Sequence, residues 1–124
     1  MVSIEELRSA VIEKQSMILE KLPSLAYDET LRLAASISAI ISNLESLQGF
    51  EELKYHTLIS EQLSNDPKAS FAKVEAIMKS SNSYVSYRNV VNLKQCALRM
   101  QNLAKIHLEY ILKNDNGDAI GRSG

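Results

Sequence analysis

The side chains that most often bind metals or act as nucleophiles are scarce in this chain of 124 residues, which contains two histidines and one cysteine. Zinc sites need several such ligands at short spacings. Neither His56 nor His107 has a second histidine or a cysteine at such a spacing, and Cys96 has no partner for a CxxC pair. Phosphate-binding loops need clustered glycines before a helix, whereas no helix-forming segment follows Gly121 and Gly124. We therefore predict no metal, no cofactor and no catalytic residues, and we expect a protein that is not an enzyme.

Charged residues divide the chain into an acidic and a basic half, although the net charge is only -1. Residues 1–66 contain 5 basic and 11 acidic residues, a net charge of -6, and residues 67–124 contain 9 basic and 4 acidic residues, a net charge of +5. Lysine and arginine can follow a nucleic-acid backbone, and tyrosine rings can stack on unpaired bases. The basic half therefore predicts a candidate anion or nucleic-acid contact, formed by Arg88, Lys94, Arg99, Lys105, Tyr84 and Tyr87.

Composition indicates a single helical domain. The chain has four glycines, two prolines and a hydrophobic fraction of 45%, which are untypical of a disordered or low-complexity sequence. A domain of this length can bury a core without disulfides or bound metal. The longest uncharged segment, residues 33–44, is too short to cross a bilayer, and the first residues lack the basic start of a secretory signal. We expect a cytoplasmic protein that does not enter a membrane.

Apolar residues recur at helical spacing in four segments. Together they predict an all-α fold, a bundle of three to four helices with a long C-terminal helix. Gly49 either ends the second helix or lies within it at a cost of about 1 kcal/mol. Periodicity is lost after Lys113, so we expect one domain over residues 1–113 and a flexible tail over 114–124. The predicted helices are residues 4–22, 28–64, 67–80 and 82–113.

Capping signals define where these helices begin. Ser3 followed by Glu6 forms a capping-box pattern, and Asp28 is a favourable N-cap for the second helix. Asp66 followed by Pro67 predicts the start of the third helix, because proline suits the first helical position. The polar run at residues 80–83 predicts a bend or a break between the third and fourth helices, since serine and asparagine side chains bond to nearby backbone.

The second and fourth helices are apolar on two sides, which indicates neighbours on both. The second helix also has the alternating three- and four-residue spacing of a coiled-coil seam. In so short a chain this pattern predicts that a second copy completes the bundle, giving a homo-oligomer. The candidate assembly surface consists of Leu33, Ile37, Ile40, Leu44, Leu47, Val90, Leu93 and Met100.

The segment at residues 79–87, with Ser81, Tyr84 and Tyr87 before a long aliphatic helix, resembles a loose class of small all-helical proteins encoded by phages and prophages. The resemblance covers roughly residues 28–112. It implies a helical-hairpin architecture and a phage origin, and it implies no site residues, because members of the class mostly lack an assigned activity. This chain departs from the class in having fewer charges on its second helix.

Three functional hypotheses follow. The first is a non-enzymatic interaction or assembly protein that self-associates through its second and fourth helices, with the acidic and basic halves orienting the contact. The second is an accessory protein that binds single-stranded nucleic acid through the basic face of the last helix. The third, which comes from the phage-like architecture, is an inhibitor that binds a host or another phage protein. The first is favoured because aromatic residues form only 6% of the chain and both tyrosines also fit an apolar stripe.

Overall fold

The computed structural model describes the backbone of residues 2–123 and the side chains of residues 2–114. This part of the chain forms helices and no strands, so the predicted all-α fold is confirmed. A short 3-10 turn, Leu22–Ser24, follows the first helix. The four helices are α1 (Ile4–Lys21), α2 (Tyr27–Asn65), α3 (Phe71–Met78) and α4 (Asn82–Ser123).

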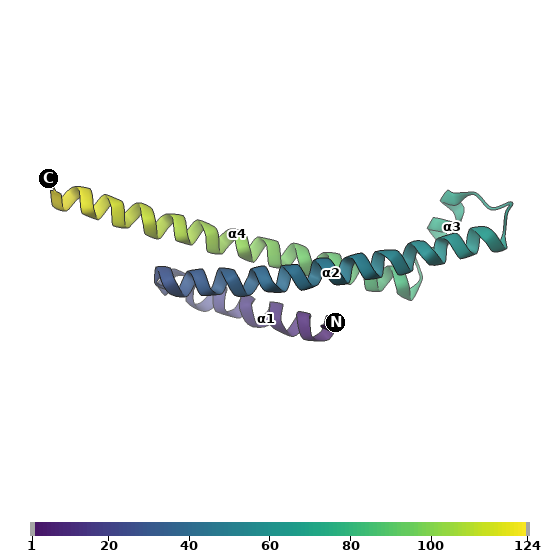
Figure 1. The fold of residues 1–124 in the computed structure, drawn as a ribbon, viewed down its shortest axis with the longest axis horizontal. Helices are drawn as coiled ribbons and strands as arrows, with labels where there is room; N and C mark the ends of the chain where they lie inside the picture. Colours follow the sequence, from purple (N-terminus) through teal and green to yellow (C-terminus); the bar gives the residue numbers. More distant parts are fainter. Residues whose placement is uncertain (1, 124) are drawn as a thin grey trace.

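The long helices α2 and α4 run antiparallel and form the frame of an elongated molecule (Figure 1). Three side-chain contacts fix their register. Near the start of α2, the imidazole Nε2 of His107 donates to the carbonyl oxygen of Leu25 at 3.1 Å. Further along, the Gln101 amide bonds the Ser38 hydroxyl at 2.7 Å, and the Lys94 ammonium lies 3.8 Å from the Glu45 carboxylate.

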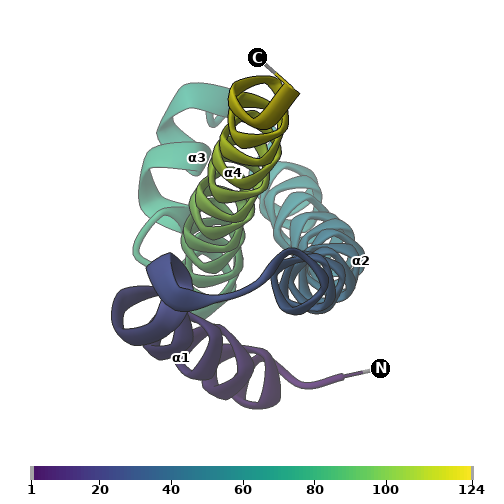
Figure 2. The ribbon, with the colours of Figure 1, turned by 90° about the vertical axis from the view of Figure 1, so that its left-hand side faces the viewer.

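The helix α1 covers only one half of this hairpin. It lies against both α2 and α4, and the end-on view shows these three helices as a triangle (Figure 2). Leu7, Val11 and Ile18 recur at helical spacing and are buried, because they face the seam between the two long helices. The larger core lies in this triangle. Its buried members are Leu7, Val11, Ile18, Leu22, Leu33, Ile37, Ile40, Ile41, Leu44, Leu47, Val90, Ala97 and Met100.

The other end of the hairpin has a separate, smaller core in which α3 takes the place of α1. Tyr55 and Ile59 of α2 are buried there against Val74 of α3. Gly49 lies within α2 between the two cores, and a Cβ at this position would contact nothing within 4 Å. The helix therefore continues through the glycine, which is the second of the two predicted alternatives.

Two predicted helix starts are wrong, and both were placed at an aspartate. The helix α2 begins at Tyr27, and its N-cap is Ala26 and not Asp28; the Ala26 amide donates to the Glu29 carboxylate at 3.2 Å. The Thr30 hydroxyl also bonds the Ala26 carbonyl, at 2.8 Å. Asp66 ends α2 instead of starting α3, since its amide donates to the Gln62 carbonyl at 3.0 Å.

The third helix is therefore shorter than the predicted span of residues 67–80. Its N-cap is Ser70, whose hydroxyl accepts from the Lys73 amide at 3.2 Å. The predicted cap at Ser3 agrees with the structure, because its hydroxyl accepts from the Glu6 amide at 3.2 Å. The predicted break at residues 80–83 is also present: α3 ends at Met78 and α4 begins at Asn82.

The last helix is longer than predicted. Its backbone stays helical through residues 114–123, where a flexible tail was expected. This stretch contains no proline, so every backbone amide can still donate to the carbonyl four residues earlier. Gly117 and the four Asx residues at 114–118 weaken a helix without forbidding one.

Candidate interaction surface

The residues predicted to form an assembly surface lie in the core of a single chain. Seven of the eight are buried between α2, α4 and α1, and the eighth, Leu93, is partly buried against the same core. The pattern correctly identified the sides of α2 and α4 that pack on helices. It wrongly assigned those sides to a second copy, because α1 and the opposite long helix already cover them. Any surface for a partner must therefore lie on the outward faces.

The outward face of α4 carries large apolar side chains in its second half. Leu103, Ile106 and Tyr110 have exposed fractions of 46%, 52% and 60%. Residues seven apart on a helix lie on nearly the same side, since seven residues make about two turns. Arg99, Ile106 and Lys113 therefore form one exposed row, with Leu103 and Tyr110 beside it. This face combines cations with apolar surface, and we call it the α4 outer face.

The outward face of α1 is apolar and acidic. Ile12 and Leu19 are 56% and 76% exposed, and they continue a row that begins with the exposed Glu5. Glu13 and Glu20 lie beside this row and are also exposed. We call this surface the α1 outer face. In the end-on view α1 lies at the bottom and the C-terminal part of α4 at the top (Figure 2). The residues of both outer faces are exposed, so each face lies away from the core between the helices.

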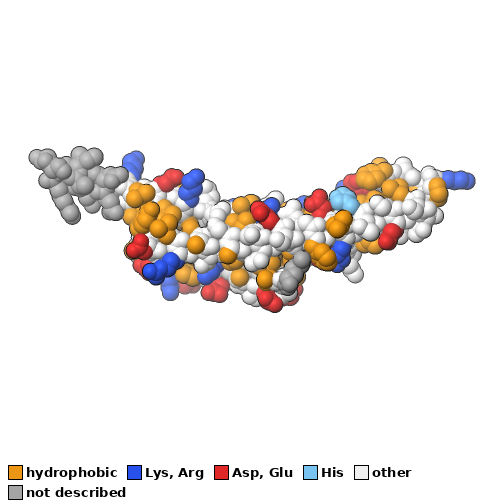
Figure 3. Space-filling view, viewed as in Figure 1, with side chains coloured by type: hydrophobic (Ala, Val, Ile, Leu, Met, Phe, Trp, Pro, Cys, Tyr) orange, Lys and Arg blue, Asp and Glu red, His pale blue; other side chains and the backbone are white. Residues whose placement is uncertain are grey.

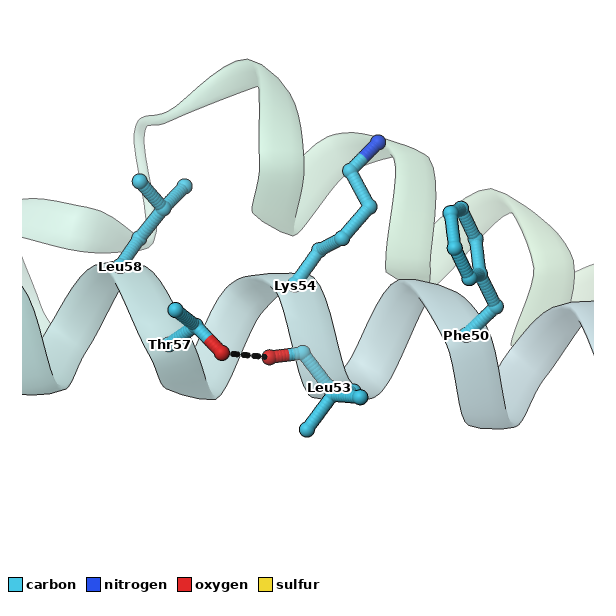
Figure 4. A pocket seen from close by; sticks show the side chains of 5 residues that line it. All are labelled: Phe50, Leu53, Lys54, Thr57 and Leu58. Atoms are coloured by element: carbon cyan, nitrogen blue, oxygen red, sulfur yellow. Dashed lines mark hydrogen bonds between the residues drawn. The ribbon is translucent and has the colours of Figure 1, made fainter.

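A shallow apolar groove lies on α2 beyond the start of α1, and all its lining residues come from α2 (Figure 4). The Lys54 ammonium lies 5.4 Å from the centre of the Phe50 ring, and the Thr57 hydroxyl donates to the Leu53 carbonyl at 2.8 Å. The groove is open because α1 does not extend this far along α2. On the face that the space-filling view shows, apolar side chains of the described residues are scattered between charged ones (Figure 3).

The structure separates the predicted cationic residues into two groups. Arg88, Arg99 and Lys105 are exposed, and no carboxylate lies within 4.0 Å of them in the part of the chain whose side chains are described. Lys94 is engaged with Glu45 across the hairpin, so it belongs to the α2–α4 contact. Of the predicted cations, the two arginines and Lys105 therefore remain on the outer surface of α4.

The two tyrosines that were predicted to stack on bases pack against a third tyrosine of the same chain. Tyr84 and Tyr87 are half-buried against Tyr55, a residue that the sequence analysis did not single out. The ring centres of Tyr55 and Tyr84 are 5.2 Å apart, and those of Tyr55 and Tyr87 are 6.2 Å apart with nearly parallel planes. Aromatic pairs at these distances stabilise a core. The two tyrosines therefore join α4 to the smaller core and do not present free rings to a nucleic acid.

Tyr55 itself is buried, and its hydroxyl has no hydrogen-bond partner among the described residues. Burial raises the pKa of the Tyr55 hydroxyl above its ordinary value of 10.0, and the nearby Glu75 and Tyr84 raise that pKa further. Ionising this hydroxyl would place an unsolvated charge in the smaller core. The buried Tyr55 hydroxyl therefore makes the folded state more stable at neutral pH than in alkali.

This shift predicts a loss of stability in alkali. In the unfolded chain Tyr55 ionises near pH 10, whereas the folded chain holds the proton to higher pH. Above pH 10 the unfolded state therefore binds fewer protons, and the free energy of unfolding falls as pH rises. Urea denaturation at pH 8 and above pH 10 should show a smaller fall for Tyr55→Phe, which cannot ionise and loses no hydrogen bond. Equal falls in both proteins would contradict the prediction.

The two histidines and the cysteine contact other residues of the same chain. His107 bonds the Leu25 carbonyl, and the His56 imidazole lies 3.7 Å from the Glu52 carboxylate on the surface of α2. Cys96 is partly buried against the larger core. No group of three or more metal-ligating side chains is found among the described residues.

A polar hollow lies where α1 begins beside α2 and α4. Ser3, Ser86 and Asn89 contribute to its wall, together with Arg8 and Glu51. Both charged groups have partners nearby, since the Arg8 guanidinium bonds Glu5 at 3.1 Å and the Lys54 ammonium lies 3.8 Å from Glu51. The hollow therefore holds locally balanced charges.

In the described part of the chain, none of the helices has the length and apolarity needed to cross a membrane. Comparison with protein-family models, with curated proteins and with solved structures finds no match to this chain.

Proposed function

We propose that this protein is a non-enzymatic helical assembly protein that binds further copies of itself through the outer face of α4. The observation that supports the proposal is the row of exposed apolar side chains at Leu103, Ile106 and Tyr110. Large apolar side chains clustered on one face and flanked by charges are typical of protein contact surfaces. The proposal keeps α4 from the sequence-based hypothesis and changes the side of the helix that makes the contact.

The energetic case rests on how much apolar surface a partner would cover. Fully burying an exposed Leu or Ile side chain contributes roughly 1.5–3 kcal/mol, and these side chains are about half exposed. Three of them therefore contribute a few kcal/mol at most, and the loss of translational freedom opposes association. We expect a reversible oligomer that forms at micromolar concentrations or above.

Light scattering after size exclusion tests the proposal. The wild-type chain should have a mass above that of the 13.8 kDa monomer at tens of micromolar, and the mass should fall on dilution. Ile106→Asp should shift the protein to monomer without loss of helical circular dichroism, because Ile106 is outside the core. Leu53→Asp is the matched control, since it places the same charge on an exposed leucine of α2. A wild-type chain that stays monomeric at tens of micromolar would refute the proposal.

A second candidate function is binding to single-stranded nucleic acid, which is favoured by the two exposed arginines of α4. Arg88 and Arg99 are eleven residues apart, so they lie on nearly the same side of the helix. Binding of a labelled oligonucleotide should weaken steeply with salt, and replacing both arginines with glutamate should abolish it. No binding at low salt would refute this candidate.

A further inference from the structure

We infer that the contact between copies is head-to-tail: the α4 outer face of one copy binds the α1 outer face of the next. This inference rests on the proposed function and specifies the second surface. It follows from two features of the described chain, the matching arrangement of apolar side chains on α1 and α4 and their opposite charge.

The apolar rows of the two faces have the same spacing. On α1, Ile12 and Leu19 are seven residues apart, and they are the exposed large apolar side chains of that helix. On α4, Leu103 and Tyr110 are also seven residues apart, with Ile106 between them. Residues seven apart lie about two turns apart on nearly the same side of a helix, so the two apolar pairs can lie opposite one another across a contact. The two rows therefore match in spacing.

Charged residues at the ends of the rows are complementary. Glu5 and Glu20 flank the apolar pair of α1, and Arg99 and Lys113 flank Ile106 on α4. The two acids are fifteen residues apart and the two bases fourteen, which correspond to about 22 Å and about 21 Å of helix. The matching lengths allow an ion pair at each end of the contact. In the monomer Glu5 bonds Arg8, while Glu20 has no ion-pair partner among the described residues.

Charge also argues against the alternative contact, in which two α4 outer faces pair with each other. Residues 82–113 contain five basic residues and one acidic residue, Glu109, a net charge of +4. A symmetric α4–α4 contact would bring these like charges together, which is unfavourable, whereas the acidic α1 outer face attracts them. The charge division of the chain thus favours contact between different faces.

The location of the two faces determines the kind of oligomer that this contact forms. They belong to two different helices, α1 at the bottom and the C-terminal part of α4 at the top of the end-on view (Figure 2), so one copy can bind two neighbours at once, one through each face. A contact between unlike surfaces generates a ring if its rotation closes and an open chain if it does not. We therefore expect oligomers larger than a dimer.

Two variants, each with one face disrupted, test the inference. Leu19→Asp disrupts the α1 outer face, and Ile106→Asp disrupts the α4 outer face. Each variant alone should be monomeric, because every contact needs one intact face of each kind. An equimolar mixture should form a one-to-one dimer and nothing larger, since only one productive pairing remains. The dimer should weaken at high salt, and Leu53→Asp should oligomerise like the wild-type chain.

The outcomes separate this inference from the proposed function. If Leu19→Asp assembles like the wild-type chain while Ile106→Asp is monomeric, the contact is between two α4 faces; the inference is then wrong and the proposed function stands. If the two monomeric variants form no dimer when mixed, the inference is also overturned. A monomeric wild-type chain would refute both. Helical circular dichroism of each variant confirms that it is folded.

Discussion

Replacing Val90 with aspartate should unfold the chain. Val90 has no exposed surface, and it lies in the larger core where α4 meets α1 and α2. A carboxylate there would lose its hydration without gaining a partner, and burying an unpaired charge is among the few single changes that cost about 4 kcal/mol or more. Helical circular dichroism should be lost at 25 °C, or the urea midpoint should fall far below that of the wild-type chain.

Val85→Asp is the matched control for this prediction. It makes the same substitution on the same helix, but Val85 is 49% exposed, so the free energy of unfolding should change by no more than about 0.5 kcal/mol. The comparison also tests the reassignment of Val90 from an assembly surface to the core. If Val90→Asp were a folded monomer, Val90 would belong to a contact between copies and the fold described above would be wrong.

The positions of the helices were predicted better than the identity of the helices that pack against them, and the reason is physical. The spacing of Leu33, Ile37 and Leu44 shows that one side of α2 packs on a helix. It contains no information on whether that helix comes from the same chain, since a seam within a chain and a seam between copies bury the same residue types. In the structure α1 and α4 fill both sides, which leaves the less conspicuous outward faces for contacts.

The starts of α1 and α4 were predicted correctly, whereas the caps of α2 and α3 were assigned to the wrong residues. Ser3 was correct because no other capping residue lies near it. Near Asp28, the Glu29 carboxylate bonds the Ala26 amide and the helix begins earlier. After Asp66, Ser70 provides the cap of α3. Propensity alone cannot choose between neighbouring caps, because the choice depends on where the chain must turn to pack.

The smaller core was missed because Tyr84 and Tyr87 were considered only as part of α4. The signal for their partner was present in α2, where Tyr55, Ile59 and Leu63 follow one another every four residues and so share a face. That face predicts a buried stripe. Its contact with α4 depends on the antiparallel register of the hairpin, which the sequence alone did not define.

Replacing Tyr55 with alanine should separate the stability of the two cores. Tyr55 is buried among Ile59, Val74 and two tyrosines of α4, so truncation removes most of the ring contacts of the smaller core. Truncations of buried aromatic residues cost about 3–5 kcal/mol, and this core has few other residues to fill the cavity. We expect α3 and the end of α2 to lose their packing while the larger core remains.

Hydrogen exchange measures the stability of each core separately. In Tyr55→Ala, amide protection should be lost in α3 and near Ile59, whereas protection around Ile37 and Leu44 should persist, because α1 and α4 still cover them. Phe50→Ala is the control, since it removes an exposed aromatic ring from the same helix and should leave both regions protected. Equal loss of protection in both regions would show that the two cores unfold as one unit, and that α2 transmits the loss of α3 packing along its whole length through Gly49.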